Sequence, residues 1–123
     1  MIKINISIVI PFYNEDENIN LTLNQVIKFF NLPKYEFLII DNGSTDNTLK
    51  HLKLFFKKNK KFIKFKYKLI ILENNKGYSG GILYGLRKAS GKLIGWTHGD
   101  GQTPLKDIKK IEKKIANKNY KKL

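Results

Sequence analysis

Apolar and polar positions divide the chain into strand-like and helix-like segments that alternate from one end to the other. The strand-like segments are short, rich in β-branched and aromatic residues, and followed by polar clusters, as buried strands are. Between them, apolar residues recur at intervals of three and four, which is the spacing of one helix face. The predicted strands are residues 4–10, 35–40, a stretch within 62–72, and 92–97, and a predicted helix follows each of them.

Local signals indicate where some of the helices begin and end. Asn14 and Glu17 have the spacing of a capping box, with Asn in place of Ser or Thr, and predict the start of the first helix. The glycine-rich third helix is predicted over residues 78–89. Thr103 and Pro104 predict the start of the fourth helix, as a cap followed by a first-turn proline.

The order βαβαβαβα predicts a Rossmann-like α/β fold, in which a parallel sheet has helices on both faces. A chain of 123 residues fits one domain, residues 1–123. Ligands of such sheets bind outside the carboxyl ends of the strands, where the strand order reverses. This rule selects four segments, which also contain the unusual polar residues: 11–15, 41–46, 73–77 and 98–102.

Composition limits the classes of protein to which the chain can belong. The absence of cysteine excludes disulfide scaffolds and thiolate metal sites, and it suits a reducing compartment. No apolar stretch approaches the roughly 20 residues that span a bilayer, and the first residues lack the layout of a signal peptide. We therefore expect a cytoplasmic location, with the cytoplasmic face of a membrane as the alternative.

The chain is strongly basic, with a net charge of +14. Only Arg87 is arginine, and all other basic residues are lysines, whereas nucleic-acid readers and tight phosphate clamps favour arginine. Together with abundant asparagine and isoleucine, the lysines are typical of an AT-rich coding sequence. We therefore expect no nucleic-acid partner and interpret residues 57–61 as a solvated charged loop, and contact with an anionic membrane remains an open alternative.

The segment after the first predicted strand contains Tyr13 and Glu15 but no glycine. It therefore lacks the glycine fingerprint of a dinucleotide-binding fold, and the chain has no Gly-Lys-Ser/Thr phosphate loop. A tyrosine ring can stack on a base, and a carboxylate can accept hydrogen bonds from a ribose or a base. In the alternative, structural interpretation, Tyr13 closes the core and Glu15 lies in the first helical turn.

Asp41 ends the second predicted strand, so it would point at the floor of a crevice. Its carboxylate could accept the imino N–H of uracil or guanine there. The alternative is an Asx turn and a helix cap, which explains Ser44, Thr45 and Asp46 well.

Gly81, Gly85 and Ala89 recur at every fourth residue of the third predicted helix. Because glycine inside a helix costs about 1 kcal/mol relative to alanine, this spacing calls for a structural reason. We interpret it as a smooth side that presses close to the sheet. Gly77 and Lys76 could instead approach a phosphate.

His98, Asp100 and Gln102 stand at alternate positions after the fourth predicted strand. In an extended loop they would project to one side. Asp and Gln supply the oxygen ligands that Mg²⁺ or Mn²⁺ prefers, whereas histidine is more typical of softer ions. A divalent metal site is therefore predicted here, and the alternative is a polar turn that contains glycines.

Taken together, the four segments resemble glycosyltransferase family 2, which has the GT-A fold. Residues 7–15 resemble the family's first strand and loop, and residues 40–46 resemble its Asp-Asp-Gly-Ser-x-Asp turn, with Asn42 in place of the second Asp. Residues 75–77 resemble its Asn-x-Gly segment, and residues 100–104 resemble the end of its metal motif. The matches follow the family's order over nearly the whole chain, and the polyprenyl-phosphate glycosyltransferases look most similar within the family.

The resemblance implies roles for individual residues. A UDP- or GDP-linked sugar would be bound by Pro11, Tyr13, Glu15, Ile40, Asp41, His98 and Gly99. A divalent cofactor, Mg²⁺ or Mn²⁺, would be bound by Asp100 and Gln102. His98 stands where the family's motif has its first Asp, so it is either a replacement metal ligand or a substitution that weakens metal binding.

The implied reaction is sugar transfer with inversion from the nucleotide diphosphate to an acceptor, such as polyprenyl phosphate in cell-envelope glycan synthesis. In the family, the catalytic base and the acceptor site come from residues that follow this region. We therefore expect the chain to be the donor-binding part of a longer enzyme, with the base beyond Leu123, and to be inactive alone. Two alternatives stay open: a non-catalytic nucleotide-binding module of the same fold, and a basic nucleic-acid-binding domain.

Overall fold

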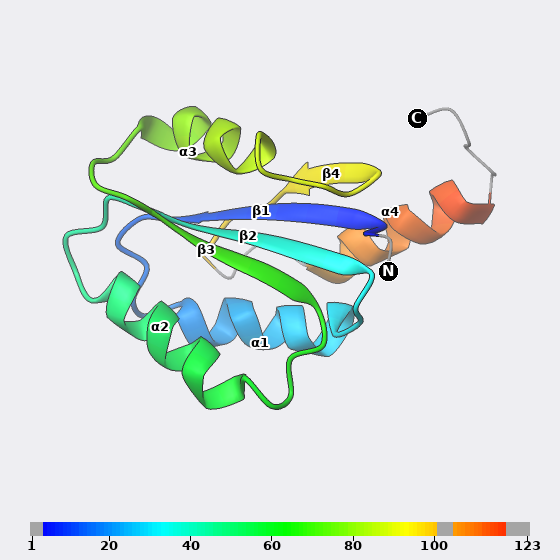
Figure 1. Ribbon diagram of the computed structural model, residues 1–123, viewed down its shortest axis with the longest axis horizontal. Helices are drawn as coiled ribbons and strands as arrows, with labels where there is room; N and C mark the ends of the chain where they lie inside the picture. The colour runs from blue at the N-terminus through cyan, green and yellow to red at the C-terminus, as the bar shows by residue number, and fades with distance from the viewer. Residues whose placement is uncertain (1–3, 101–104, 118–123) are drawn as a thin grey trace.

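The computed structural model describes residues 4–100 and 105–117, and within them strands and helices alternate as predicted (Figure 1). The strands are β1 (Ile6–Phe12), β2 (Tyr35–Asn42), β3 (Lys66–Leu72) and β4 (Leu93–Trp96). The helices are α1 (Ile19–Phe30), α2 (Thr48–Asn59), α3 (Gly77–Leu86) and α4 (Leu105–Asn117). This order confirms the predicted Rossmann-like α/β fold.

The strands form one parallel sheet in the order β3-β2-β1-β4. β1 is therefore central, with Ile8 opposite Phe37 of β2 and opposite Gly95 of β4. The chain adds β2 and β3 on one side of β1 and then returns to the other side for β4, so the strand order reverses between β1 and β4. The carboxyl ends of the strands lie at one edge of the sheet, on the left of Figure 1, where a ligand site is expected.

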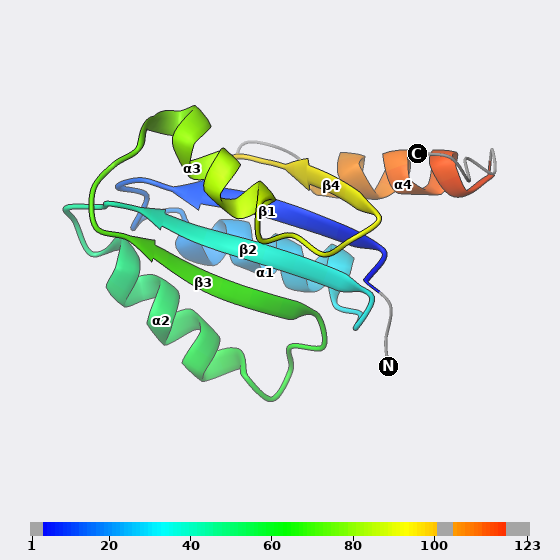
Figure 2. The ribbon, with the colours of Figure 1, turned by 45° about the horizontal axis from the view of Figure 1, so that its top comes forward.

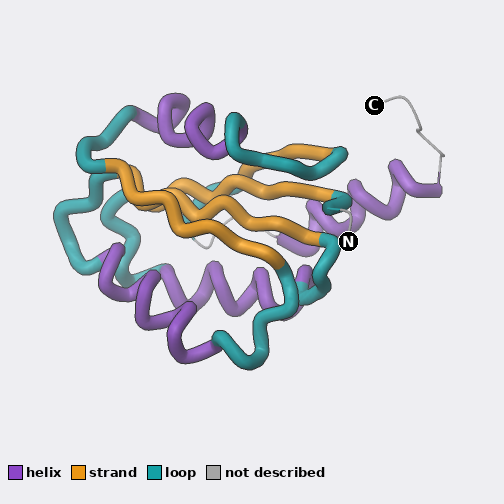
Figure 3. The backbone as a smooth tube through the Cα atoms, viewed as in Figure 1, coloured by secondary structure: helices purple, strands orange, loops and turns teal. Residues whose placement is uncertain are grey.

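Helices cover both faces of the sheet, with α3 on one face and α1 and α2 on the other (Figure 1, Figure 3). The larger core lies under α1 and α2 and includes the fully buried Phe30, Phe37 and Leu52. Fully burying a side chain of this kind contributes about 1.5–3 kcal/mol. The smaller core lies under α3 and includes Leu38 and Ile40. Alternate residues of β2 therefore supply the two cores.

The glycines of α3 allow this helix to lie close to the sheet, as the sequence predicts. A Cβ atom at Gly85 would stand 2.5 Å from Cγ1 of Val9 and 3.3 Å from Cδ1 of Ile40. The first distance is far inside the optimum of about 3.5–4.0 Å between carbon atoms. Gly81 approaches the sheet similarly, because its Cβ would stand 2.9 Å from Nδ2 of Asn42.

α3 ends at Leu86, three residues before its predicted end. The Lys88 amide donates to the Gly85 carbonyl at 3.0 Å and the Ala89 amide donates to the Leu86 carbonyl at 3.3 Å. Bonds between residues three apart form a tighter turn than an α-helix. Ala89 thus lies beyond the helix, although it still packs against the smaller core.

A buried polar network attaches the start of β4 to the centre of the sheet. Oε1 of the buried Glu36 accepts hydrogen bonds from Oγ of Ser7 at 2.8 Å and from the Ser90 amide at 3.0 Å. The Gly91 amide donates to Oγ of Ser7 at 2.8 Å. A buried carboxylate is costly without such donors. The turn that leads into β4 is therefore fastened to both β1 and β2.

The predicted start of the first helix is wrong, because α1 begins at Ile19 rather than near Asn14. Asn14 has a φ of 51°, a left-handed conformation that asparagine tolerates but that a helix start does not use. Asn18 occupies the N-cap position without a side-chain cap, and its Nδ2 donates to Oε2 of Glu15 at 2.7 Å.

β1 continues through Pro11 and Phe12, two residues past its predicted end, where it pairs with the end of β2. The Val9 carbonyl accepts the Thr97 amide at 3.0 Å. In a parallel strand, the backbone N–H and C=O groups of residues two apart point toward the same neighbouring strand. The backbone of Pro11 therefore points toward the β4 side, as that of Val9 does. At Pro11, however, β4 no longer pairs with β1. The missing N–H of proline is therefore not needed by the described strands, which explains how the strand tolerates it.

Other boundaries also differ from the predictions. β2 continues to Asn42, and α2 continues to Asn59, so Lys57 and Lys58 form a last helical turn rather than a loop. α4 begins with the buried Leu105, and its predicted start at residues 103–104 lies outside the described residues. Among the helices in residues 4–100 and 105–117, none is long and apolar enough to cross a membrane.

We predict that Gly85→Val destabilises the fold by about 1–3 kcal/mol, because the overpacked contact with Val9 forces α3 away from the sheet. Leu83→Ala is the control on the exposed side of the same helix, and it should change the free energy of unfolding by less than about 0.5 kcal/mol. Urea unfolding followed by circular dichroism measures both. Equal stability of Gly85→Val and the unchanged chain would show that α3 does not rest on Val9.

Candidate functional site

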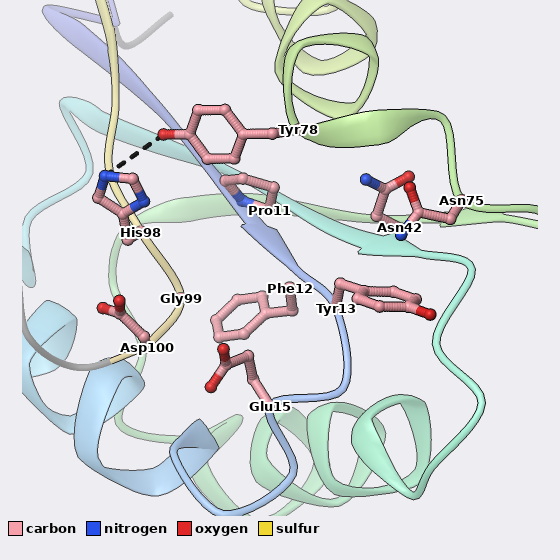
Figure 4. A pocket seen from close by; sticks show the side chains of 10 residues that line it. All are labelled: Pro11, Phe12, Tyr13, Glu15, Asn42, Asn75, Tyr78, His98, Gly99 and Asp100. Atoms are coloured by element: carbon pink, nitrogen blue, oxygen red, sulfur yellow. Dashed lines mark hydrogen bonds between the residues drawn. The ribbon is translucent and has the colours of Figure 1, made fainter.

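A cavity of about 250 Å³ lies at the carboxyl edge of the sheet. Its walls come from the ends of β1 and β2, the loop before α3, the first turn of α3, and the loop after β4 (Figure 4). The lining residues are Pro11, Phe12, Tyr13, Glu15, Asn42, Asn75, Tyr78, His98, Gly99 and Asp100. Each of the four segments that the sequence selects therefore contributes to one cavity.

Asn14 ties the loop after β1 to the turn after β2. Its Oδ1 accepts the Thr45 amide at 2.8 Å, and its Nδ2 donates to Oγ1 of Thr45 at 3.2 Å. The next residue, Glu15, donates its amide to Oγ1 of Thr48 at 2.9 Å. These bonds fix the backbone on which Tyr13 and Glu15 reach the cavity.

Asp46 lies one residue before Asn47, the N-cap residue of α2. Its Oδ1 accepts the Thr48 amide at 2.9 Å and the Thr48 hydroxyl at 2.5 Å. Partial desolvation tends to raise the pKa of Asp46, but hydrogen bonds from Thr48 and from the Asp16 backbone outweigh it and lower the pKa below its ordinary value of 3.8. The stabilisation that this carboxylate adds is therefore present above the unfolded pKa and is lost as the pH falls through the lower, folded pKa.

Asn42 joins the end of β2 to the start of α3. Its Oδ1 accepts the Lys76 amide at 2.9 Å, and its Nδ2 donates to the Gly77 carbonyl at 2.9 Å. An ionised aspartate could only accept, so the amide side chain is required for both bonds. Asn75 adds to the same turn, because its Oδ1 accepts the Gly77 amide at 2.6 Å. The turn places Tyr78 at the cavity.

Tyr78 and His98 form an aromatic wall of the cavity. Their ring centroids lie 5.2 Å apart with an angle of 18° between the planes, and the Tyr78 hydroxyl lies 3.4 Å from Nε2 of His98. The pair connects the first turn of α3 with the loop after β4, as Figure 4 shows. Both side chains are exposed, so the wall could stack on a planar group.

The loop after β4 is held at Gly99. The Gly99 carbonyl accepts the hydroxyl of Thr22 in α1 at 3.2 Å. A Cβ atom at Gly99 would stand 2.5 Å from the ring of Phe12, so only glycine allows the loop to pass this close to the ring. The flanking residues, His98 and Asp100, both line the cavity.

The charge of the cavity differs from that of the chain. The lining residues that the structure describes include two carboxylates, Glu15 and Asp100, and no lysine or arginine, although the net charge of the chain is +14. Such a lining disfavours a diphosphate by itself but suits Mg²⁺ or Mn²⁺. Mg²⁺ commonly takes one or two protein carboxylates and completes its shell with water and phosphate oxygens.

The predicted metal ligands are only partly within the described residues. His98 and Asp100 line the cavity, whereas Gln102 lies outside the described residues. In the described part of the chain, no group of three or more His, Asp or Glu side chains could hold a metal ion. The described lining, with its two carboxylates, therefore fits an ion that takes part of its ligands from the protein.

The structure separates the predicted nucleotide-sugar residues into two groups. The cavity brings together Pro11, Tyr13, Glu15, His98 and Gly99. Ile40 is instead fully buried under α3, and its side chain belongs to the smaller core. Asp41 is 3% exposed and its Oδ1 accepts the Ser44 amide at 3.2 Å, which is the Asx-turn contact of the alternative interpretation. Neither side chain reaches the cavity.

Four lining residues were not among the predicted site residues: Phe12, Asn42, Asn75 and Tyr78. The first three fall within the segments selected by the carboxyl-edge rule, and Tyr78 directly follows one of them. Their positions in the sequence could therefore have identified them as site residues, whereas their residue types alone could not.

The comparison with protein families gives one match over nearly the whole chain. The model described as glycosyl transferase family 2 matches residues 7–121.

Curated relatives cover the chain at moderate identity. The dolichyl-phosphate beta-glucosyltransferase of Homo sapiens is 30% identical over 115 residues, which cover 88% of this chain and 35% of the human protein. The undecaprenyl-phosphate 4-deoxy-4-formamido-L-arabinose transferase of Proteus mirabilis is 34% identical over 113 residues, which cover 89% of this chain and 33% of that protein. The chain thus spans about a third of the length of these curated relatives.

Solved structures share the fold. A mannosyltransferase from Pyrobaculum calidifontis in complex with GDP-Man and Mn²⁺ matches with a TM-score of 0.69 and 21% identity, covering 80% of this chain and 28% of that one. S. aureus TarS 1–349 in complex with UDP matches with a TM-score of 0.66 and 24% identity, covering 92% of this chain and 33% of that one. These likenesses confirm the predicted GT-A fold.

We predict that Asn42→Asp destabilises the fold by about 1–3 kcal/mol, because a carboxylate oxygen would face the Gly77 carbonyl where a donor stands now. Asn74→Asp is the matched control, since it makes the same charge change at an exposed position of the same edge, and it should cost less than about 0.5 kcal/mol. The urea midpoints of unfolding of both variants test this prediction. If the two variants behave alike, Asn42 does not join β2 to α3.

Proposed function

Because the chain belongs to glycosyl transferase family 2, we propose that its cavity binds the nucleotide-sugar donor of a glycosyl transfer reaction. The observation that carries the proposal is an acidic cavity in a basic chain, placed where the strand order reverses. The two solved relatives in complex with GDP-Man and Mn²⁺ and with UDP share this fold, which supports a ligand of the same class.

The nucleoside is proposed to lie against residues at the end of β1. Tyr13 is 45% exposed at the cavity, so its ring is available to stack on a base. Pro11 supplies a second rigid apolar surface, and the carboxylate of Glu15 can accept hydrogen bonds from hydroxyl or imino groups. Ile40 and Asp41 are left out of the proposed contacts because their side chains are engaged elsewhere.

The diphosphate is proposed to be bound through a divalent ion at Asp100. Such an ion, when bound, offsets the negative charge that develops on the departing nucleoside diphosphate. Asp100 offers the hard oxygen ligand, and Gln102 is the proposed second ligand. Because Nε2 of His98 faces the Tyr78 hydroxyl, we assign His98 to the aromatic wall beside the donor rather than to the metal.

The acceptor is proposed to be a lipid phosphate. The curated relatives include transferases named for dolichyl phosphate and for undecaprenyl phosphate. A phosphate oxygen is already anionic at neutral pH, so it can form the bond to the anomeric carbon without a protein base while the nucleoside diphosphate leaves.

A second candidate function is a nucleotide-binding module without catalysis. It is favoured by the lack of any group of three metal-binding His, Asp or Glu side chains among the described residues. It shares the cavity but predicts nucleotide binding that is indifferent to divalent metal, so the metal dependence of binding distinguishes the two functions.

We predict that UDP or GDP raises the melting temperature and that Mn²⁺ enlarges the increase, because the ion bridges the acidic lining and the diphosphate. A ligand at 100 times its Kd stabilises the folded state by about 2.7 kcal/mol. Asp100→Ala should abolish the contribution of Mn²⁺, whereas Asp107→Ala, a control at an exposed carboxylate of α4, should retain it. Differential scanning fluorimetry measures each case. No shift with either nucleotide would refute donor binding, and a shift without metal dependence would favour the non-catalytic module.

A further prediction distinguishes stacking by the aromatic wall from binding of the metal. His98→Ala and Tyr78→Ala should each weaken binding of the nucleotide sugar roughly threefold to tenfold, by the same factor in Mn²⁺ and in EDTA, because a lost stacking contact does not depend on the ion. Tyr84→Ala, at an exposed tyrosine of α3 outside the cavity, is the control. Isothermal titration calorimetry gives the affinities. If His98→Ala removes the Mn²⁺ dependence as Asp100→Ala does, His98 is a metal ligand and its assignment to the wall is wrong.

A further inference from the structure

Residues 47–72 combine an absence of acidic residues with a high content of lysine. Between Asp46 and Glu73 there is no aspartate or glutamate. The same stretch contains nine lysines, all of them exposed: Lys50, Lys53, Lys57, Lys58, Lys60, Lys61, Lys64, Lys66 and Lys68. Nine of the 24 basic residues of the chain thus lie on α2, in the turn after it and on the edge strand β3, with no acidic residue between them in the sequence.

The outer side of α2 combines this charge with exposed apolar surface. Leu52, Phe55 and Phe56 point into the core, so the opposite side of the helix faces solvent. A shallow hollow of about 420 Å³ lies there, lined by Leu49, Lys50, Lys53, Leu54 and Lys57. Two leucines therefore lie between three ammonium groups on a surface that no described segment covers.

The turn after α2 presents an aromatic ring among the lysines. Phe62 is 67% exposed, more than any other large hydrophobic side chain that the structure describes. The turn is well fixed, because Nδ2 of Asn31 donates to the Phe62 carbonyl at 2.8 Å and Oδ1 of Asn31 accepts the Lys64 amide at 2.6 Å. The Phe62 amide donates to the Asn59 carbonyl at 2.9 Å. The fold thus holds this ring outward on a rigid support.

We propose that this surface docks on an anionic lipid bilayer. The docking surface consists of Leu54, Phe62 and seven lysines: Lys50, Lys53, Lys57, Lys58, Lys60, Lys61 and Lys64. Lysines close to an anionic membrane are attracted to its headgroups, and an exposed phenylalanine can enter the boundary between headgroups and acyl chains. Because the inner side of α2 stays in the core, the helix lies on the membrane and does not insert.

Lipid fits this surface better than nucleic acid, the other common polyanion. Proteins that bind single strands stack bases on several aromatic rings and use arginine beside them. The docking surface has one exposed aromatic ring, at Phe62, and no arginine. Its other apolar residue, Leu54, has no flat face on which a base could stack, but it suits the interior edge of a lipid headgroup layer.

The docking surface is separate from the cavity but begins close to it. Lys50 lies in the first turn of α2, two residues after Thr48, whose hydroxyl accepts the Glu15 amide. Figure 2 shows α2 and its turn on the side of the sheet away from α3. Docking does not depend on donor binding, so a failure of one proposal leaves the other intact.

Co-sedimentation with lipid vesicles tests the proposal. The chain should bind vesicles of phosphatidylcholine mixed with phosphatidylserine and should not bind vesicles of phosphatidylcholine alone. Each lysine near such a surface strengthens partitioning about fivefold, so Lys60→Gln combined with Lys61→Gln should weaken it about 25-fold. Phe62→Ser should weaken binding further while leaving the lysines in place. All three positions are exposed, so unchanged melting temperatures are expected and are measured alongside.

The matched control is Lys88→Gln combined with Lys92→Gln, which makes the same charge change at exposed positions after α3, outside the docking surface. It should change vesicle binding less than threefold. Equal losses in both double variants would show a general charge effect and would overturn the docking surface. Absence of binding to phosphatidylserine vesicles would overturn it as well. So would a Lys60→Gln and Lys61→Gln variant that loses affinity for a short single-stranded oligonucleotide but keeps its affinity for the vesicles.

Discussion

The early end of β4 is the constraint on which the site depends. β4 pairs with β1 only up to Trp96, opposite Val9, and the last bond between them joins the Thr97 amide to the Val9 carbonyl. Beyond this point the chain leaves the sheet and passes under the ring of Phe12, where the Thr22 hydroxyl holds Gly99. The last residues of β1 therefore have β2 on one side and the cavity on the other.

The position of β4 is itself determined at the far end of the strand. Glu36 and Ser7 hold the turn at Ser90 and Gly91, so β4 enters the sheet in a fixed register. Since β4 is only four residues long, that register also determines where His98 and Asp100 emerge. A polar network at the amino edge of the sheet thus positions the loop that lines the cavity at the carboxyl edge.

The sequence was sufficient for the order of elements and for the location of the cavity. Both depend on local patterns: apolar periodicity for the elements, and the meeting of the strands' carboxyl ends for the cavity. What the sequence could not provide depends on contacts between distant residues. Asn14 looked like a helix cap, but its side chain is bonded to Thr45, 31 residues away. Asp41 is a different case, because its carboxylate accepts the amide of Ser44 only three residues further on, and this local Asx turn was the alternative interpretation of the sequence.

The aromatic wall illustrates the same limit. Tyr78 and His98 are 20 residues apart, and only the crossover from α3 to β4 brings their rings together. The residue type at His98 suggested a metal ligand, whereas its neighbour in space suggests a stacking surface. Among the described residues, the lining of this cavity has two carboxylates and no lysine or arginine, although the chain has a net charge of +14. A divalent ion between protein and diphosphate is the simplest way for an acidic lining to hold an anionic ligand.

That central claim, a divalent ion held at Asp100 by a bound diphosphate, is tested most directly by paramagnetic broadening in the amide NMR spectrum. Mn²⁺ is added in small amounts to the chain saturated with UDP or GDP. The signals of Glu15 and of residues 98–100 should broaden first, and the effect should be much weaker without nucleotide, since the diphosphate supplies most of the ligands. Broadening centred on Asp107, or broadening that is the same with and without nucleotide, would contradict the claim.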